Sequence, residues 1–401
     1  MGRTKHRKKQ QTKTQAAPVS ASAPAPSTSA QPPTAVTVED LLVQAAQGIG
    51  SLEYQKAKQL CVQAVQLAHQ EQQDKPAETD PRMLRDALEI LGTVELELDE
   101  VEEAREHFLT SIQLANALPD PSPAPHLYLA QLSATPQESL QHFANALVIL
   151  QAKLEALEKA KLGGDGSAGT TDEAEDESEI RRSASRALVG MTELYLTDLC
   201  FEPDAEQNCE KYLEQAVGLD PSDPEAYQTL ASVRLSQQRP EDAKAALEQG
   251  WELWRNVEAD SPLYPPAASR LTCAKLFLEL SSIVPALEIL HRLENEDDED
   301  SEVWYLSGWA WWLLGEDRAE KQASEDEESK EECWSEAKLC LQNYLTLEER
   351  DPASADPEQM AHVRELIAKL DAAGIVASTG AEGEAVDAGW EDASDDEAME
   401  E

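Results

Sequence analysis

The stretch Asp223-Pro224-Glu225-Ala226-Tyr227-Gln228-Thr229-Leu230-Ala231 decides the fold, because the spacing of its large and small residues recurs along the chain. Counted from Tyr227, the markers are Leu230 and Ala231 at +3 and +4, Ala243 at +16, Leu247 at +20 and Gly250 at +23. The same offsets hold in two further sets: Leu88 with Leu91, Gly92, Ala104, Phe108 and Ser111, and Arg270 with Cys273, Ala274, Ala286, Leu290 and Leu293. One spacing in three registers indicates a repeat.

The spacing predicts a pair of antiparallel helices as the repeating unit. A small residue one turn into the first helix lets the second helix approach closely, and the large residue at +20 is expected to fill the space between neighbouring pairs. One such pair cannot bury its own apolar face, so several pairs must stack into a solenoid. The spacing resembles the tetratricopeptide repeat, a helix-turn-helix unit of about 34 residues.

The small-large-small signature of the second helix predicts about seven pairs in total. Four further copies complete the set: Ala57/Cys61/Ala64, Ser139/Phe143/Ala146, Cys209/Leu213/Ala216 and Ala337/Leu341/Tyr344. Large residues stand at the last marker in Leu293 and Tyr344, and we expect looser stacking at the C-terminal end for this reason. A final amphipathic helix, Pro357 to Leu370, is expected to cap the array. The fold class is therefore all-α, a tetratricopeptide-repeat α-solenoid with a C-terminal capping helix.

Composition divides the chain into three regions. Residues 1–37 hold a basic cluster and a Pro/Ser-rich stretch, which predicts disorder and is compatible with a nuclear import signal or an inert tail. Residues 38–372 hold the superhelix, beginning with Thr37 and Asp40 as an N-cap signature and carrying acidic insertions near 163–179 and 316–332. Residues 373–401 contain no basic residue and form a predicted disordered acidic tail.

The charge and the motifs indicate a binding protein rather than an enzyme. The formal net charge of -46 favours a basic protein partner and disfavours direct contact with nucleic acid or anionic membranes. The seven His and six Cys show no metal-ligand spacing, and no nucleophile or phosphate-loop motif is present. No apolar run has the length of a membrane helix, and the basic N-terminus lacks the apolar segment of a secretory signal. We expect no catalytic residue, metal or cofactor.

A solenoid of this kind offers a concave groove lined by its first helices. The repeat register predicts that the groove carries Asp86, Glu89, Thr93, Glu97, Glu225, Gln228, Ser232, Leu235, Leu271, Lys275, Glu279, Glu302, Tyr305, Trp309 and Trp312. From this set the predicted client-binding residues are Asp86, Glu89, Glu97, Glu225, Gln228, Ser232, Glu279, Glu302, Tyr305, Trp309 and Trp312. We expect Trp304 and Trp311 in the core, and Trp309 and Trp312 exposed in the groove, where aromatic rings beside carboxylates suit Lys and Arg side chains.

Two stretches, together with the array, resemble one known family. They are Thr192-Glu193-Leu194-Tyr195-Leu196-Thr197-Asp198-Leu199-Cys200-Phe201-Glu202-Pro203-Asp204-Ala205-Glu206-Gln207 and, in the acidic tail, Trp390-Glu391-Asp392-Ala393. They are similar to the fungal tetratricopeptide-repeat assembly chaperones dedicated to the fourth large-subunit ribosomal protein. The resemblance implies a cytoplasmic and nuclear chaperone that binds the newly made ribosomal protein through its basic internal loop. It also implies that the chaperone keeps its client soluble until assembly into the large subunit.

Two other functions are compatible with the same residues. A repeat scaffold that clamps a C-terminal peptide is one, although such scaffolds use Lys and Arg in the groove, where this register offers mainly carboxylates and Lys275. A histone-type chaperone for basic proteins is the other, because it relies on the same charge complementarity. An import receptor that reads the N-terminal basic cluster would be a further partner.

Overall fold

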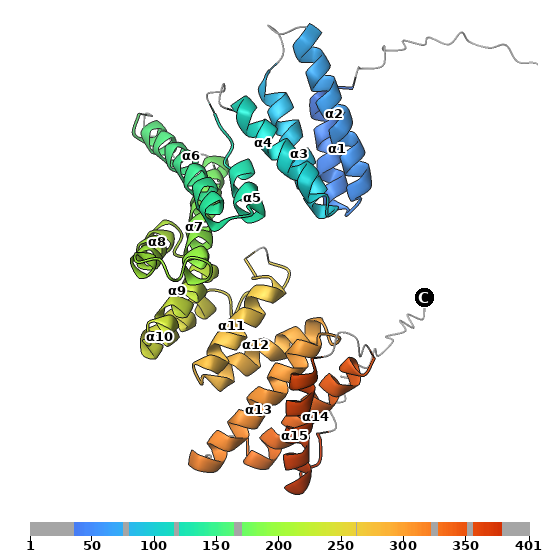
Figure 1. Cartoon of the computed structure of the whole chain (residues 1–401), viewed down its shortest axis with the longest axis vertical. Helices are drawn as coiled ribbons and strands as arrows, with labels where there is room; N and C mark the ends of the chain where they lie inside the picture. Colours follow the sequence, from blue (N-terminus) through green and yellow to red (C-terminus); the bar gives the residue numbers. More distant parts are fainter. Residues whose placement is uncertain are drawn as a thin grey trace, which may run out of the picture.

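The chain folds into antiparallel helix pairs that follow one another along an open arc (Figure 1). The computed structural model describes residues 36–74, 80–115, 120–163, 171–261, 263–321, 328–350 and 356–378. The helices in these ranges are α1 (Val38–Gly50), α2 (Tyr54–Asp74), α3 (Arg82–Glu97), α4 (Val101–Ala115), α5 (Ala124–Leu132), α6 (Pro136–Gly163), α7 (Thr171–Leu196), α8 (Ala205–Leu219), α9 (Pro224–Ser236), α10 (Pro240–Glu252), α11 (Ala267–Glu279), α12 (Ile283–Glu296), α13 (Ser301–Lys321), α14 (Lys330–Glu348) and α15 (Pro357–Ala372). The described ranges contain no strand, which confirms the predicted all-α solenoid.

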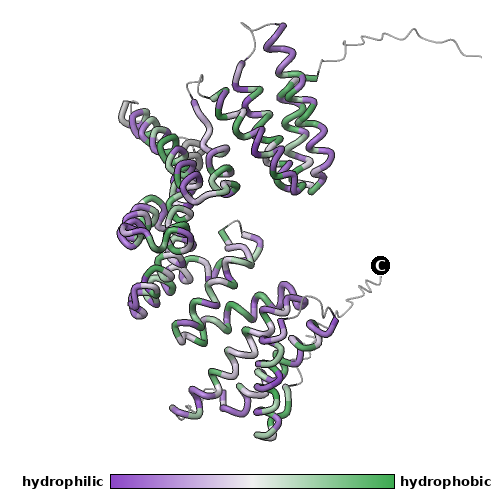
Figure 2. Tube along the Cα trace, in the orientation of Figure 1, coloured by the Kyte–Doolittle hydropathy of each residue, from purple (hydrophilic) through white to green (hydrophobic). Residues whose placement is uncertain are grey.

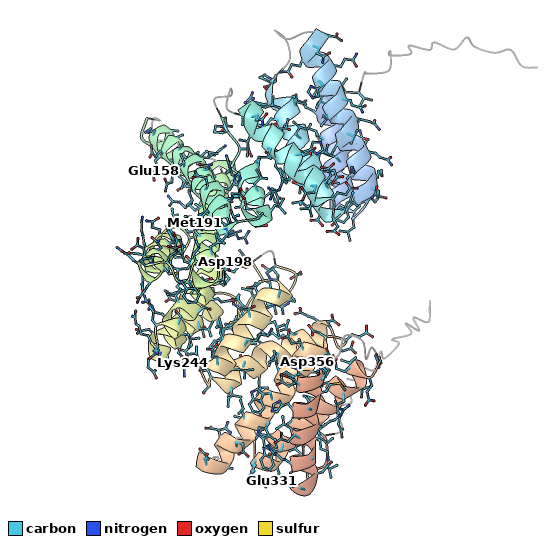
Figure 3. All side chains as sticks on the ribbon, viewed as in Figure 1. Glu158, Met191, Asp198, Lys244, Glu331 and Asp356 are labelled. Carbon is cyan, nitrogen blue, oxygen red and sulfur yellow. The ribbon has the colours of Figure 1, made fainter. Side chains whose placement is uncertain are left out.

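The stacking of first helices gives the array its curvature. Each pair packs internally, and first helices of successive pairs also touch, as in α1 with α3, α7 with α9, α9 with α11 and α11 with α13. Second helices such as α6 and α10 lie toward the outside of the arc, where Figure 3 shows Glu158 and Lys244. The inner surface therefore comes mainly from first helices and the connections beside them.

The sequence starts its helices with side chains that satisfy free backbone N–H groups. Asp223 precedes Pro224 and accepts a hydrogen bond from the backbone N of Glu225, and Asp356 does the same for Glu358 at the start of α15. Thr37 and Asp40 form a reciprocal capping box at the start of α1, as the sequence predicts. These caps determine where α1, α9 and α15 begin through hydrogen bonds between residues close in sequence.

The repeat spacing corresponds to a close contact between the two helices of a pair. A Cβ added to Gly92 on α3 would lie 2.8 Å from the ring of Phe108, and one added to Gly308 would lie 2.6 Å from Leu341. Gly250 meets Tyr227 in the same way, at 2.8 Å from its Cβ. Real Cβ atoms do not approach so closely, so the small residue is required for the second helix to reach its position.

Hydrophobic residues are distributed along the whole array instead of gathering in one centre. Hydrophilic and hydrophobic residues alternate along the helices in Figure 2, and the buried ones form a series of clusters shared by neighbouring helices. One cluster runs from Ala231 on α9 to Cys333 on α14, and another from Ala130 on α5 to Val233 on α9. Each pair thus buries its apolar face against its neighbours, as expected for a repeat array.

The expectation of loose stacking at the C-terminal end is wrong. Leu293 and Tyr344, the large residues at the last marker, are both buried. Tyr344 packs against Leu366 and Leu370 of α15 in one cluster, and its hydroxyl lies 3.0 Å from Oε1 of Gln359. The extra volume fills the space between α14 and the capping helix, so a small residue there would leave a void.

The acidic insertions are shorter than predicted. Helix α7 begins at Thr171 rather than near Ile180, and α13 continues to Lys321 before α14 begins at Lys330. A capping box between Ser329 and Glu332 starts α14 within the segment that was expected to be an insertion. In α14 the acidic residues Glu331 and Glu332 lie in the first helical turn, where carboxylates complement the positive end of the helix dipole.

The predicted tail contains a packed beginning. Ile375 joins the apolar cluster around α14 and α15, its carbonyl accepts a hydrogen bond from Lys338 Nζ at 2.7 Å, and the backbone N of Ser378 donates to the carbonyl of Ser335. These contacts hold residues 375–378 against α14. The predictions for residues 1–35 and 379–401 lie outside the described residues.

Leu247→Ala tests the dependence of the array on its +20 residue. Leu247 has no exposed surface, so we expect the free energy of unfolding to fall by about 2–5 kcal/mol, from lost burial and the cavity left behind. The measurement is thermal and denaturant unfolding of the full chain, followed by circular dichroism.

The matched control is Leu109→Ala, the same change at a side chain that is 40% exposed on α4. We expect an effect within about 0.5 kcal/mol. Equal losses in the two variants would contradict the role of the +20 position.

Candidate functional site

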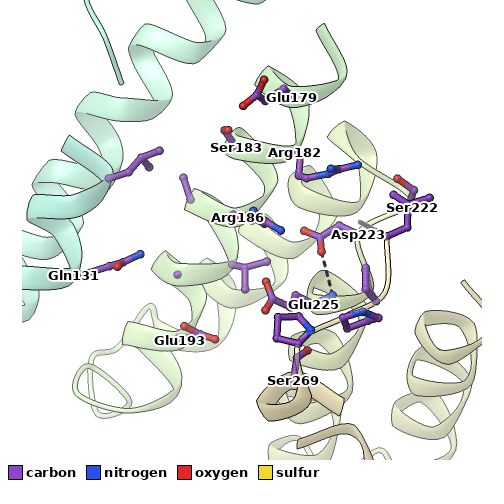
Figure 4. A pocket seen from close by; sticks show the side chains of 18 of the residues that line it. Gln131, Glu179, Arg182, Ser183, Arg186, Glu193, Ser222, Asp223, Glu225 and Ser269 are labelled. Atoms are coloured by element: carbon purple, nitrogen blue, oxygen red, sulfur yellow. Dashed lines mark hydrogen bonds between the residues drawn. The ribbon is translucent and has the colours of Figure 1, made fainter. Parts of the chain in front are cut away.

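A hollow on the inner side of the arc is the candidate site. It has a volume of about 1020 Å³ and lies between α5, α7, the start of α9 and the connection from α10 to α11 (Figure 4). We call it the central hollow, and its lining includes Tyr128, Gln131, Glu179, Arg182, Arg186, Glu193, Asp223, Glu225, Trp254, Tyr264 and Ser269. Its size is in the range of pockets that hold a few side chains of a partner.

Helix α7 supplies one wall of the hollow through residues that share a helix face. Arg182, Arg186 and Glu193 follow one another along α7 at spacings of four and seven residues, which returns them to one side of a helix. In Figure 4 these residues face the start of α9, where Asp223 and Glu225 lie. The stacking of α7 on α9 therefore brings charged groups from two pairs together.

Asp223 fixes the start of α9, which forms the second wall of the hollow. Its Oδ1 accepts from the backbone N of Glu225, and its Oδ2 accepts from the hydroxyl of Ser185 on α7 at 3.0 Å. One carboxylate thus caps α9 and ties it to α7. This double role explains why Asp223 is buried although it is charged.

The carboxylates of the hollow are held in a poorly solvated and mutually repulsive arrangement. Burial raises the pKa of Asp223, and burial together with the neighbouring Asp223 raises the pKa of Glu225. Loss of bulk water inside the hollow, followed by repulsion from Glu225, raises the pKa of Glu193 as well. Glu193 keeps an accessible side chain, but the surrounding walls replace much of its water. Each carboxylate would be stabilised by an added positive charge.

The arginines offset only part of this negative charge. Arg186 lowers the pKa values of Asp223 and Glu225 by its positive charge, but burial outweighs this effect in both. Arg182 lies 3.7 Å from Asp220, which is outside the lining. The lining holds the carboxylates of Glu179, Glu193, Asp223 and Glu225 against these two guanidinium groups, so its formal charge remains negative.

The predicted site residues on α3 serve the array itself. Glu89 is half-buried and accepts a hydrogen bond from Ser111 of α4, and burial raises its pKa. Asp86 pairs with the neighbouring Arg85 at 2.7 Å, and Glu97 interacts with Tyr54 on α2. None of the three lines the central hollow.

The predicted residues on α9, α11 and α13 are divided between the hollow and helix contacts. Glu225 lines the hollow, whereas Gln228 is buried and donates to Ser269 of α11, and Ser232 donates back to the carbonyl of Gln228. Glu302 pairs with Lys275 at 2.7 Å across α11 and α13, with both side chains exposed. Glu279 is exposed on α11 outside the hollow.

The prediction that Trp309 and Trp312 are exposed in the groove is wrong, because both are partly buried against other helices. Trp304 and Trp311, predicted to lie in the core, are likewise only partly buried. The ring of Trp309 lies 5.0 Å from that of His362 on α15, and the Tyr305 hydroxyl lies 3.1 Å from Nδ1 of the same histidine. Trp312 stacks on Trp334 of α14 with ring centroids 4.9 Å apart. The capping helix and α14 occupy this aromatic face, since exposed rings of this size gain most by packing together.

Sequence reasoning missed Arg186 and Glu193 because the connection from α7 to α8 is long. Leu188 occupies the position of Tyr227 in its pair, since Met191 and Thr192 follow at +3 and +4. The offsets of -2 and +5, which select Glu225 and Ser232 from Tyr227, then select Arg186 and Glu193. The +16 marker could not reveal this register, because Cys209 stands at +21 from Leu188.

No metal or membrane chemistry emerges from the described residues. They contain no cluster of three or more His, Cys, Asp or Glu side chains arranged to hold a metal ion. Within the same ranges, every helix is too short or too polar for a membrane span. The six cysteines are free, and all except Cys200 are buried.

Comparisons with known proteins identify relatives that match most of the chain. A protein of Schizosaccharomyces pombe described as a probable assembly chaperone of rpl4 is 31% identical over 330 residues, covering 82% of this chain and 91% of the relative. A protein of Emericella nidulans with the same description is 33% identical over 237 residues, which are 57% of this chain and 55% of that protein. No family model matches the chain.

One solved structure is similar in both fold and sequence. It comprises residues 1–338 of an assembly chaperone of RpL4 (Acl4), superposes with a TM-score of 0.63 and is 29% identical. The match covers 72% of this chain and 100% of that structure.

Glu193→Gln tests whether the hollow places a destabilised carboxylate on α7. Glu193 stands in the last turn of α7, where the helix dipole disfavours a negative charge, and the raised pKa shows that its surroundings disfavour ionisation. We expect the amide to increase the free energy of unfolding at pH 7 by roughly 0.3–1 kcal/mol, the usual effect of such a terminal charge.

The effect of Glu193→Gln on the free energy of unfolding should depend on pH in one direction. A carboxyl whose pKa is raised in the folded state stabilises the fold fully below its unfolded pKa of about 4.3. This contribution is lost as the pH rises through the higher folded-state pKa. The advantage of Glu193→Gln over wild type should therefore vanish when unfolding is measured below about pH 4. A variant less stable than wild type at pH 7 would mean that Glu193 stabilises the array.

Proposed function

The chain belongs to the family of assembly chaperones of Rpl4, and we propose that its central hollow binds the basic internal loop of this newly synthesised ribosomal protein. The family relatives are described as chaperones and not by a reaction, which supports a non-enzymatic role. The proposal assigns the client contact to Glu193 and Glu225, with Asp223 setting their positions.

The observation that carries the proposal is the uncompensated negative charge inside the hollow. Burial and repulsion from Glu225 raise the pKa of Glu193, and burial and repulsion from Asp223 raise the pKa of Glu225, so the free protein holds both carboxylates at a cost. An inserted Lys or Arg side chain would relieve both effects by adding the missing positive charge.

The arrangement suits a segment that is later transferred to RNA. A basic loop made for ribosomal RNA lacks counter-charge before assembly and would associate with other polyanions. Carboxylates supply that counter-charge without the stacking and groove contacts that RNA offers, so RNA can replace them. Binding of this kind would keep the client soluble until it joins the large subunit, in the cytoplasm and then in the nucleus.

The remaining acidic surface would act mainly on the rate of encounter. The formal net charge of -46 attracts a basic client over about one Debye length, roughly 8 Å at physiological salt. Contacts in the hollow would then set specificity, because desolvated charges discriminate between partners more strongly than exposed ones. An import receptor that reads the N-terminal basic residues would carry the complex into the nucleus.

A double variant, Glu193→Gln with Glu225→Gln, tests the proposal. Loss of two charge-assisted contacts should raise the dissociation constant for full-length Rpl4 by roughly 10- to 100-fold, measured by isothermal titration calorimetry. The matched control is Glu214→Gln with Glu241→Gln, the same charge change at exposed positions on α8 and α10.

The control variant distinguishes a specific contribution of the hollow to client binding from a general effect of lowering the negative charge of the protein. We expect the control variant to bind within about two-fold of wild type, because exposed rim charges contribute little affinity. Equal weakening in both variants would move the client contact out of the hollow. Capture of histones instead of Rpl4 from cells, identified by mass spectrometry, would replace the chaperone assignment by the histone-type alternative.

A further inference from the structure

We infer that the central hollow reads a segment of mixed charge: Arg182 and Arg186 bind a carboxylate of the client, while Glu193 and Glu225 bind a cationic side chain. The inference rests on the proposed function and adds to it, because a uniformly basic segment would have no use for the two arginines. It makes the hollow selective for a charge pattern and for the direction in which the client chain runs through it.

The first step is the position of the arginines. Both lie on the face of α7 that lines the hollow, four residues and therefore about one helical turn apart. Figure 4 shows Arg182 extending from α7 toward Ser222 and Arg186 extending toward Asp223, at the start of α9. Each guanidinium group can bind a carboxylate through two parallel hydrogen bonds, and two groups one turn apart place two such donors side by side.

The second step is that the protein leaves these guanidinium groups available. Arg186 is exposed and forms no direct ion pair within 4.0 Å among the charged groups described in the structure, although Asp223 and Glu225 are close enough to interact with it. Arg182 forms only a long ion pair with Asp220, with 3.7 Å between Nε and Oδ2, which exceeds a hydrogen-bond distance. By contrast, Arg234 and Arg270 on neighbouring first helices form hydrogen-bonded pairs with Glu210 and Glu296.

The third step is the separation of the two charges along α7. Arg186 and Glu193 are seven residues apart, which corresponds to about 10 Å along the helix axis. An extended chain covers this distance in about three residues. Because an extended chain points alternate side chains to opposite faces, an acidic and a basic side chain that both face α7 are separated by two or four positions in the client segment.

The charge pattern would also reject other polycations. Bare carboxylates attract any basic protein, whereas two arginines in the same hollow repel a uniformly basic segment. A client with one carboxylate in the correct place gains a contact at the point where an unrelated polycation meets repulsion. The hollow would thus obtain specificity from an unfavourable interaction as well as from favourable ones.

The test is the double variant Arg182→Gln with Arg186→Gln, measured against two probes. We expect the dissociation constant for full-length Rpl4 to rise about ten-fold or more, from the lost carboxylate contact. For poly-lysine, we expect binding to become about two-fold tighter, because two repelling charges are removed. Arg364→Gln, at an exposed position on α15, is the matched control and should change neither value by more than about two-fold.

The two probes keep the inference separate from the proposed function. If wild type binds Rpl4 and the variant binds both probes more tightly, the arginines only reduce the negative potential and the inference is overturned. If wild type does not bind Rpl4 at all, the proposed function itself fails. Circular dichroism of the variant confirms that loss of binding does not come from unfolding.

The source of the carboxylate is distinguished by altering the client. Extending the C-terminus of Rpl4 by a neutral tag removes a terminal carboxylate from its position but leaves internal Asp and Glu side chains in place. Replacing the Asp and Glu residues that flank the basic internal loop by Asn and Gln has the converse effect. We expect the second change to weaken binding to wild type and to have no effect on the arginine variant; weakening by neither change would overturn the inference.

Discussion

The close contact between the small residue at +4 and the large residue at +20 is the constraint on which the rest of the array depends. Gly92 against Phe108 and Gly308 against Leu341 leave no room for a Cβ, so the second helix of each pair lies directly on the first. This contact sets the thickness of a pair and hence the distance at which the next pair stacks. Because each pair packs only on its neighbours, small rotations accumulate and curve the array.

The curvature produces the central hollow and determines its chemistry. Bringing α7 and α9 side by side places Glu193 near Glu225, and the cap of α9 by Asp223 adds a third carboxylate. A fold built for stability alone would have paired these groups, as Arg270 and Glu296 are paired a short distance along the array. The raised pKa values therefore mark a place where the array holds charge ready for a partner, at some expense of its own stability.

The periodic residues predicted the architecture well because each of them acts over a short range. Caps such as Thr37 with Asp40 and markers such as Gly308 depend on residues within one pair, so the chain order alone locates them. The register also placed Glu225 on the inner surface correctly. It could not place Tyr305, Trp309 and Trp312, since their partners His362 and Trp334 lie on helices that arrive from later in the chain.

The sequence by itself determined the helix pairs, their number and their acidic character, because small and large residues at fixed offsets have only one compact arrangement. Tertiary structure decided which carboxylates stay uncompensated. Asp86 and Glu225 occupy the same repeat position, two residues before Leu88 and Tyr227, yet Asp86 pairs with Arg85 whereas Glu225 lies near Glu193 across a helix boundary. The reason is physical: a charge is stabilised or destabilised by whatever lies within a few ångströms, and the stacking of separate pairs sets those distances.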